Sequence, residues 1–205
     1  MLIESYGDPA FLPKLEQAAR YLVESQGEQG TWTYRAPVPS HFFPETVIAE
    51  PKDDEALINV VGGRRVEKPD LSDAPLLRSQ PWPMGSDGDN SCTQFAVLGL
   101  WSAMRAGIQI DADVWRRVLR TTARRQDHSD NPENFGGWAY TRPGTAYGSM
   151  TCAGICTTAL ALKHLDEKVT PREDLRIRNG VSWLIRHFSA DQNPEKDDWH
   201  YYYIY

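Results

Sequence analysis

Two segments of the chain are apolar nearly all the way around a helical wheel. They read SCTQFAVLGLWSAMRAG at 91–107 and MTCAGICTTALALKHL at 150–165, and they align when Thr93 is matched to Thr151. A helix with this pattern is buried on every side. We therefore predict two buried helices that belong to an internal repeat. The residues expected to be buried on them are Phe95, Val97, Leu98, Leu100, Ile155, Leu160 and Leu162.

Helices of a second kind, apolar on one side only, are predicted before and after these segments. The pattern places them at 13–26, 113–126 and 171–188. One-sided apolar character is typical of a helix that faces solvent on its other side. Three arginines of the second of these helices are therefore expected to be exposed: Arg117, Arg120 and Arg124.

The last of the one-sided helices carries a start signal in the sequence. Thr170 stands where an N-cap residue belongs, Pro171 occupies the first helical position, and Glu173 completes a capping box. The pattern therefore predicts that the helix begins at Pro171. Its apolar stripe is expected to consist of Leu175, Val181, Leu184, Ile185 and Phe188.

Alternation of fully apolar helices with one-sided helices predicts two concentric layers. Inner helices contact only protein, whereas outer helices contact water on one face; a four-helix bundle would make every helix one-sided. We expect an all-α fold of the α/α toroid (α/α-barrel) kind, partial, with about three helical hairpins. The chain 1–205 would form a single partial domain, and the Pro- and Gly-rich stretch 36–86 an irregular insertion.

A recurrent tryptophan turn follows each one-sided helix, in the strings QGEQGTWTY, ENFGGWAYT and KDDWHYYYIY. The first turn and the helix before it fill the frame of the Q-W motif, with Ala18, Tyr21, Leu22, Gln26, Gly30 and Trp32. The second repeat keeps Gln126, Gly136 and Trp138 but has a longer loop, and the third keeps Gly180, Trp183, Leu184 and Trp199. On these residues the chain resembles the squalene cyclase and prenyltransferase superfamily.

The resemblance implies that the Gln and Trp side chains are part of the scaffold, with the glutamine amide tying a helix end to the neighbouring repeat. It also implies a closed ring of about six hairpins. This chain would then be the partial sequence of a longer protein or an open half-ring. Its partner would be the remainder of the toroid or another copy of the chain, covering the apolar residues 201–205.

The same resemblance points to a site for acid chemistry. Class II cyclases protonate an alkene, without a cofactor, through the middle Asp of a D-x-D-D motif in an aromatic cavity. Asp89 matches that proton donor and Asp87 the first Asp, whereas Asn90 replaces the last one. The plainer alternative is that Asp89 or Asn90 is only the N-cap of the following helix.

A second chemistry of the superfamily is zinc-dependent prenyl transfer. Cys92 in S-C-T-Q-F and His200 in D-D-W-H resemble the zinc-binding segments of those enzymes, but Asn90 stands where the Asp ligand belongs and is a poor zinc ligand. No metal site is therefore expected.

Aromatic residues at the tryptophan-turn end of the repeats are the candidates for substrate binding. In cyclases such rings line the cavity and stabilise carbocations through their π faces. A packed junction between hairpins would explain the same rings. The candidates are Trp138, Tyr140, Tyr201 and Tyr202.

Charge and composition narrow the partners further. A formal net charge of −6 argues against nucleic acid, which requires a basic surface. The first residues lack the pattern of a signal peptide, and no apolar run approaches the ~20 residues that span a bilayer. We expect a cytoplasmic or peripheral membrane protein with an apolar isoprenoid ligand. It would be either a cyclase-like isomerase or a non-catalytic toroid that serves as a scaffold or ligand-binding module.

Overall fold

A computed structural model describes residues 12–34, 75–79, 81, 83, 88–165 and 170–196. Across these ranges the fold is all-α, as expected: it contains helices and a few isolated β-bridges but no β-strand. The elements are α2 (Leu12–Glu24), α4 (Asn90–Arg105), α5 (Ala112–Arg125), α6 (Gly148–Leu165), the 3-10 turn η4 (Pro171–Glu173) and α7 (Leu175–His187).

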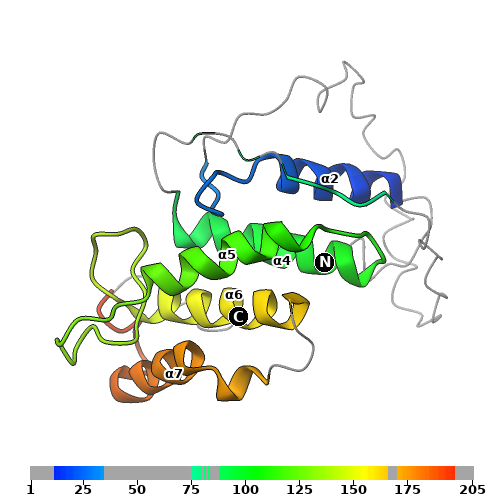
Figure 1. The fold of residues 1–205 in the computed structure, drawn as a ribbon. Coiled ribbons are helices and arrows are strands. Elements are labelled where there is room, and N and C mark those ends of the chain that lie inside the picture. The colour runs from blue at the N-terminus through cyan, green and yellow to red at the C-terminus, as the bar shows by residue number, and fades with distance from the viewer. Residues whose placement is uncertain are drawn as a thin grey trace, which may run out of the picture.

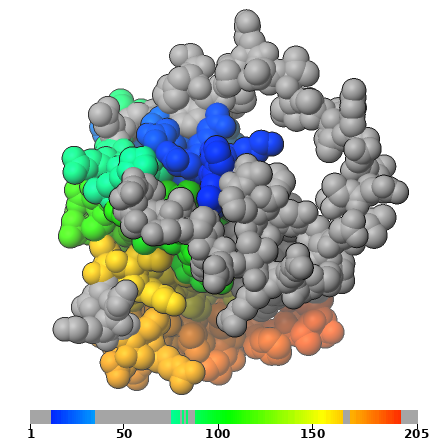
Figure 2. Space-filling view, turned by 90° about the vertical axis from the view of Figure 1, so that its right-hand side faces the viewer, coloured from blue at the N-terminus to red at the C-terminus, as the bar shows by residue number. Residues whose placement is uncertain are grey.

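The helices are stacked in chain order, from α2 at one end to α7 at the other (Figure 1). The same order is visible after a quarter turn, with α2 and the segment 170–196 at opposite ends (Figure 2). The fully apolar helices α4 and α6 pack on each other, α2 packs on α4, and both α5 and α7 pack on α6. We refer to α4 and α6 as the apolar helices and to α2, α5 and α7 as the flanking helices.

Burial on the apolar helices follows the prediction only where a neighbouring helix covers them. Val97, Leu100 and Leu162 are buried, and Leu98, Ile155 and Leu160 are half-buried. The prediction for Phe95 is wrong, because its side chain is 55% exposed. An all-round apolar pattern shows that a helix has no polar face, but it does not show how many neighbours cover it.

The flanking helix α5 agrees closely with its predicted pattern. Val114 and Val118 are buried, and Arg120 and Arg124 are exposed. Arg117 is half-buried rather than exposed, because its guanidinium group donates hydrogen bonds to the buried side chain of Gln26.

The start of α7 differs from the predicted capping box. Thr170 makes no side-chain capping bond and introduces only the short turn η4. The helix begins at Leu175, where the carboxylate of Asp174 accepts a hydrogen bond from the backbone N–H of Arg176 at 2.9 Å. Asp174 therefore takes the capping role, since a carboxylate caps as well as a threonine hydroxyl or better.

The apolar stripe of α7 is also different from the prediction. The buried residues are Ile177, Gly180 and Trp183. Leu184 is half-buried, and the other four residues of the predicted stripe are exposed: Leu175, Val181, Ile185 and Phe188. The periodicity identified an amphipathic helix correctly but placed its covered side wrongly.

The insertion expected at 36–86 lies mostly outside the described residues. One described part of it is ordered by backbone pairing: Leu77 is buried, its N–H donates to Gln109, and its carbonyl accepts from Asp111. This short piece therefore belongs to the core rather than to an irregular loop.

The first Gln-Trp pair joins consecutive flanking helices. Gln26 Nε2 donates to the carbonyl of Val114 in α5 at 3.1 Å, and its Oε1 accepts from Arg117 Nε at 2.9 Å. Trp32 Nε1 donates back to the carbonyl of Leu22 in α2 at 2.8 Å. Both Gln26 and Trp32 are buried. We call this arrangement a latch.

The second pair repeats the latch one hairpin later. Gln126 Nε2 donates at 2.8 Å to the carbonyl of Arg176 in α7 and at 2.8 Å to that of Gly136. Trp138 Nε1 donates at 2.9 Å to the carbonyl of Thr122, which precedes Gln126 by the same spacing as Leu22 precedes Gln26. The repeated atoms and partners support the scaffold role that the sequence predicted for these residues.

The two threonines that aligned the sequence repeat take part in the same junctions. Thr93 Oγ1 accepts from the backbone N–H of Trp32 at 3.3 Å, and Thr151 Oγ1 accepts from that of Trp138 at 3.2 Å. Each tryptophan turn is therefore tied to the first turn of the apolar helix that follows it.

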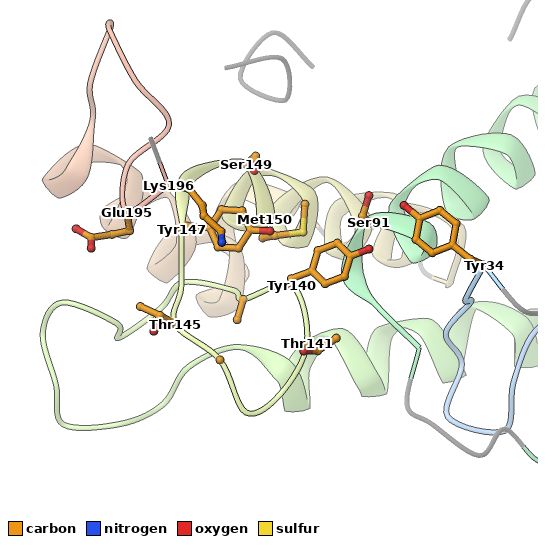
Figure 3. A pocket seen from close by; sticks show the side chains of 12 residues that line it. Tyr34, Ser91, Tyr140, Thr141, Thr145, Tyr147, Ser149, Met150, Glu195 and Lys196 are labelled. Atoms are coloured by element: carbon orange, nitrogen blue, oxygen red, sulfur yellow. The ribbon is translucent and has the colours of Figure 1, made fainter. Parts of the chain in front are cut away.

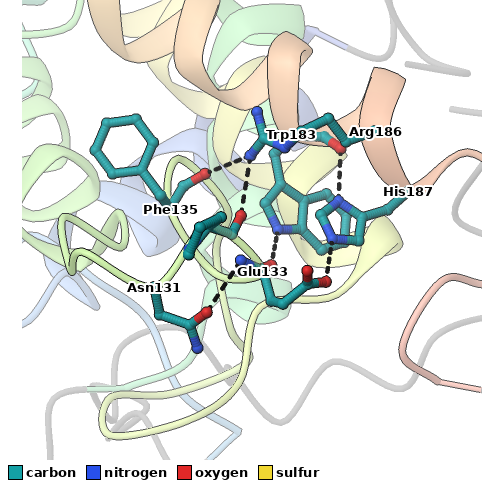
Figure 4. Close-up of polar contacts among 7 residues, drawn as sticks. Asn131, Glu133, Phe135, Trp183, Arg186 and His187 are labelled. Carbon is teal, nitrogen blue, oxygen red and sulfur yellow. Dashed lines mark hydrogen bonds and ion pairs between the residues drawn. The ribbon is translucent and has the colours of Figure 1, made fainter.

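The longer loop of the second repeat adds contacts of its own to α7 (Figure 4). Trp183 Nε1 donates to the carbonyl of Glu133 at 2.7 Å, and Arg186 donates to the carbonyl of Phe135 at 3.0 Å. The His187 ring stacks on Trp183 with centroids 4.1 Å apart, and its Nε2 lies 3.2 Å from Glu133 Oε2. The added residues hold the last flanking helix in place.

A glycine in each latch provides a sharp test of this architecture. Gly136 has φ +90°, and a Cβ there would lie 2.6 Å from the carbonyl oxygen of Asn179 in α7. Gly136→Ala should lower the free energy of unfolding by roughly 3 kcal/mol or more, because it adds backbone strain to a clash with main-chain atoms. Urea denaturation would measure the change.

Gly99→Ala is the matched control. A Cβ at Gly99 would meet only the tip of the Leu22 side chain, at 2.8 Å. Alanine is also favoured over glycine within a helix by roughly 0.5–1 kcal/mol. Near-neutral Gly99→Ala is expected, and equal losses at both glycines would show that the latch makes no special demand on Gly136.

Candidate functional site

A pocket of about 770 Å³ lies at the N-terminal ends of the two apolar helices (Figure 3). Its wall combines tyrosine rings with a methionine, several hydroxyl side chains and one charged pair. The lining residues are Tyr34, Ser91, Ala139, Tyr140, Thr141, Gly144, Thr145, Tyr147, Ser149, Met150, Glu195 and Lys196.

The repeat explains why these residues come together. Tyr34 and Tyr140 each lie two residues after a latch tryptophan, and Ser91 and Ser149 are each the second residue of an apolar helix. Equivalent positions of two successive repeats therefore form opposite parts of one wall. Because the latches fix both the tryptophan turns and the helix starts, the pocket is built on the most constrained part of the fold.

Buried hydrogen bonds hold the wall in position. The backbone N–H of Asn90 donates to the carbonyl of Tyr140 at 2.9 Å, and its side-chain amide donates to that of Ala139 at 2.6 Å. On the other side, Asn193 Oδ1 accepts from the backbone N–H of Ser149 at 2.9 Å, and Asn193 Nδ2 donates to Ser149 Oγ at 3.0 Å. The turns that carry the tyrosines are therefore fixed to the helices.

Asp89, the residue matched to a cyclase proton donor, is the N-cap of α4. Its Oδ1 accepts a hydrogen bond from the backbone N–H of Cys92 at 2.7 Å, and the residue is buried. The positive end of the helix stabilises a negative charge on this carboxylate. Asp89 is not among the lining residues, although Ser91 two positions later is. Asp87 lies outside the described residues.

Two side chains near Asp89 hold their protons more tightly than usual. Burial raises the pKa of the Cys92 thiol from 9.0 to about 12, and hydrogen bonding to Asp89 and the charge of that carboxylate raise it further. Burial also raises the pKa of Tyr140, with added contributions from a hydrogen bond with Tyr34 and from the charge of Asp89. Both groups are therefore neutral at physiological pH.

The structure separates the predicted aromatic candidates. Tyr140 lines the pocket, whereas the ring of Trp138 is fully buried beside Gly154 and Gly180 and belongs to the second latch. Tyr201, Tyr202 and His200 lie outside the described residues.

Sequence analysis did not identify Tyr34, Tyr147 or Lys196 as site residues, although all three line the pocket. The signal for Tyr34 was present, because it follows Trp32 at the same spacing at which Tyr140 follows Trp138. Lys196 Nζ lies 5.7 Å from the centroid of the Tyr147 ring, a contact between distant segments that no local pattern predicts.

Within the part of the chain that the structure describes, no cluster of three His, Cys, Asp or Glu side chains is arranged to hold a metal ion. None of the helices described combines the length and apolar character needed to cross a membrane. Comparisons with models of known protein families, with curated proteins and with solved structures found no match.

Alkylation of Cys92 reports the charge on Asp89. At pH 9 a thiol with a pKa of about 12 is about one part in a thousand thiolate, so iodoacetamide should modify Cys92 slowly. Asp89→Asn keeps the cap but removes the negative charge, and should accelerate the reaction by about tenfold. Peptide mass spectrometry would give the rate at each cysteine.

Cys152 and Cys156 serve as internal controls, because the causes that raise their pKa values do not include Asp89. Their rates should be the same in both proteins. If Asp89→Asn leaves the Cys92 rate unchanged as well, Asp89 carries no charge beside the thiol, which is the state that a proton donor would need.

Proposed function

We propose that the protein is part of an α/α toroid of the squalene cyclase and prenyltransferase kind, and that it binds an isoprenoid-like molecule in this pocket. The observation that carries the proposal is the pocket itself, at the starts of α4 and α6, where two successive repeats contribute equivalent residues. Its volume falls within the range of ~300–1,000 Å³ that is usual for small-molecule sites.

The chemistry of the wall supports an amphipathic ligand. The rings of Tyr34, Tyr140 and Tyr147 and the side chain of Met150 offer apolar contact to a hydrocarbon body. Hydroxyl groups such as those of Ser91 and Ser149 suit a polar end, for example an alcohol.

Binding without catalysis is the form of the proposal that the contacts of Asp89 favour. A cyclase acid must be protonated and must point at the substrate, whereas the Asp89 carboxylate accepts a backbone N–H at the positive end of α4. Its neighbour Asn90 is also engaged, with its Oδ1 accepting from Arg125 at 3.0 Å. The raised pKa of Cys92 likewise opposes a zinc site, since zinc binds the thiolate.

The toroid part of the proposal is supported by the repeated latch. Gln26 and Gln126 each reach forward to the next flanking helix and place it at the same position relative to the tryptophan turn. Repetition of one such step is how a repeat array extends, and a constant rotation per step would curve it into a ring.

Titration with farnesol, an isoprenoid alcohol, tests the binding site. Tyr140→Ala should weaken binding by about tenfold in isothermal titration calorimetry, because it removes one ring of the wall. Phe135→Ala is the matched control: Phe135 is 38% exposed, close to the 37% of Tyr140, but does not line the pocket. Its affinity should equal that of the unmodified protein.

Absence of saturable farnesol binding, or equal losses in the two variants, would refute the proposed site. Incubation with squalene separates binding from cyclisation. A cyclic product that disappears in Asp89→Asn would show that the protein is a cyclase instead, because this change preserves the cap and removes only the acid.

A further inference from the structure

The latches define which positions of the three flanking helices correspond. Gln26 bonds the carbonyl of Val114 in α5, and Gln126 bonds that of Arg176 in α7. The latch glycines confirm this register, because Gly30 approaches the backbone three residues beyond Val114 and Gly136 the backbone three residues beyond Arg176. Because the two glutamines correspond, α2 aligns with α5 in turn.

In this register, one side of each flanking helix faces the apolar helix that comes next in the chain. Three sets of equivalent residues define it: Leu15, Trp115 and Ile177; Ala19, Leu119 and Val181; Val23, Ala123 and Ile185. In α2, all three are buried, and α4 is the helix that packs there. In α5, Trp115 contacts His164 of α6 with ring centroids 4.5 Å apart.

The same side of α7 is apolar but exposed. Val181 is 40% exposed, Ile185 73% and Phe188, which stands at the position of the latch glutamines, 70%. We call these three residues the open flank. They lie at the end of the helix stack, beside the buried Ile177. Their counterparts are covered in the other two flanking helices, and what covers them there is an apolar helix of the next hairpin.

The opposite end of the stack has a different character. Ala18 of α2 corresponds to Val118 and Gly180, which are buried against the preceding hairpin, yet Ala18 is exposed together with Lys14 and Gln17. This end presents small and polar side chains, as a terminal repeat does. It offers no apolar surface to match the open flank, which argues against head-to-tail association of two copies.

We propose that the open flank of α7 is the docking surface for one further helix of the α4 and α6 type, carried by an additional hairpin of the same repeat. The partner helix is apolar on all sides and follows a tryptophan turn. It packs against Val181 and Ile185 as α4 packs against Ala19 and Val23. The interface continues one that the structure already contains twice.

The test compares the full chain with an extended chain. In the extended chain, a second copy of residues 139–188 is fused after Trp199 in place of residues 200–205. The added apolar helix then follows Trp199 as α6 follows Trp138. Ile185→Asp, made in the original α7 only, should lower the Tm of the extended chain by roughly 5–10 °C, because it places a charge in the new interface. In the full chain it should change the Tm by at most ~1–2 °C, since Ile185 is exposed there.

Leu175→Asp in the original α7 is the matched control, because Leu175 is similarly exposed but lies outside the open flank. It should leave the Tm of both chains unchanged. Equal effects of Ile185→Asp in the two chains would overturn the proposal. So would sedimentation of the full chain as a dimer that Ile185→Asp dissociates, because the occupant would then be a second copy.

Discussion

The side-chain amide of one glutamine per repeat is the interaction on which the rest of this fold depends. Gln26 and Gln126 each end a flanking helix and bond the first turn of the next, which sets the position of that helix. The tryptophan of the turn then packs under the junction, and the tyrosine two residues later reaches the pocket. Register, core and candidate site thus follow from one polar contact.

Burial is what makes these contacts decisive. Both glutamines are fully buried, and a buried polar group left without a partner costs roughly 1–3 kcal/mol. A shift of α5 by one residue would leave the Gln26 amide without the Val114 carbonyl and bring side chains against Gly30. Apolar packing alone tolerates such shifts better, because it is not directional.

The parts of the structure that could be predicted from sequence are those encoded by short patterns. Helix type follows from periodicity, and the latch residues follow from the spacing of Gln, Gly and Trp. Exposure of Phe95 and Ile185 could not be predicted, because a periodic pattern does not show which neighbours are present. The start of α7 was wrong because Thr170 and Asp174 are competing caps, and only packing selects between them. In the candidate site, Tyr140 was found through the family resemblance, but Lys196 comes from a distant segment.

Hydrogen exchange in Gln126→Ala tests most directly whether the latch holds consecutive hairpins together. The account predicts that the amides of α7 lose protection by about tenfold or more, because removing the side chain frees the carbonyls of Arg176 and Gly136. The amides of α2 and α4, which the first latch holds, should keep theirs. Unchanged protection in α7, or an equal loss throughout the described helices, would contradict the central role given to the glutamine.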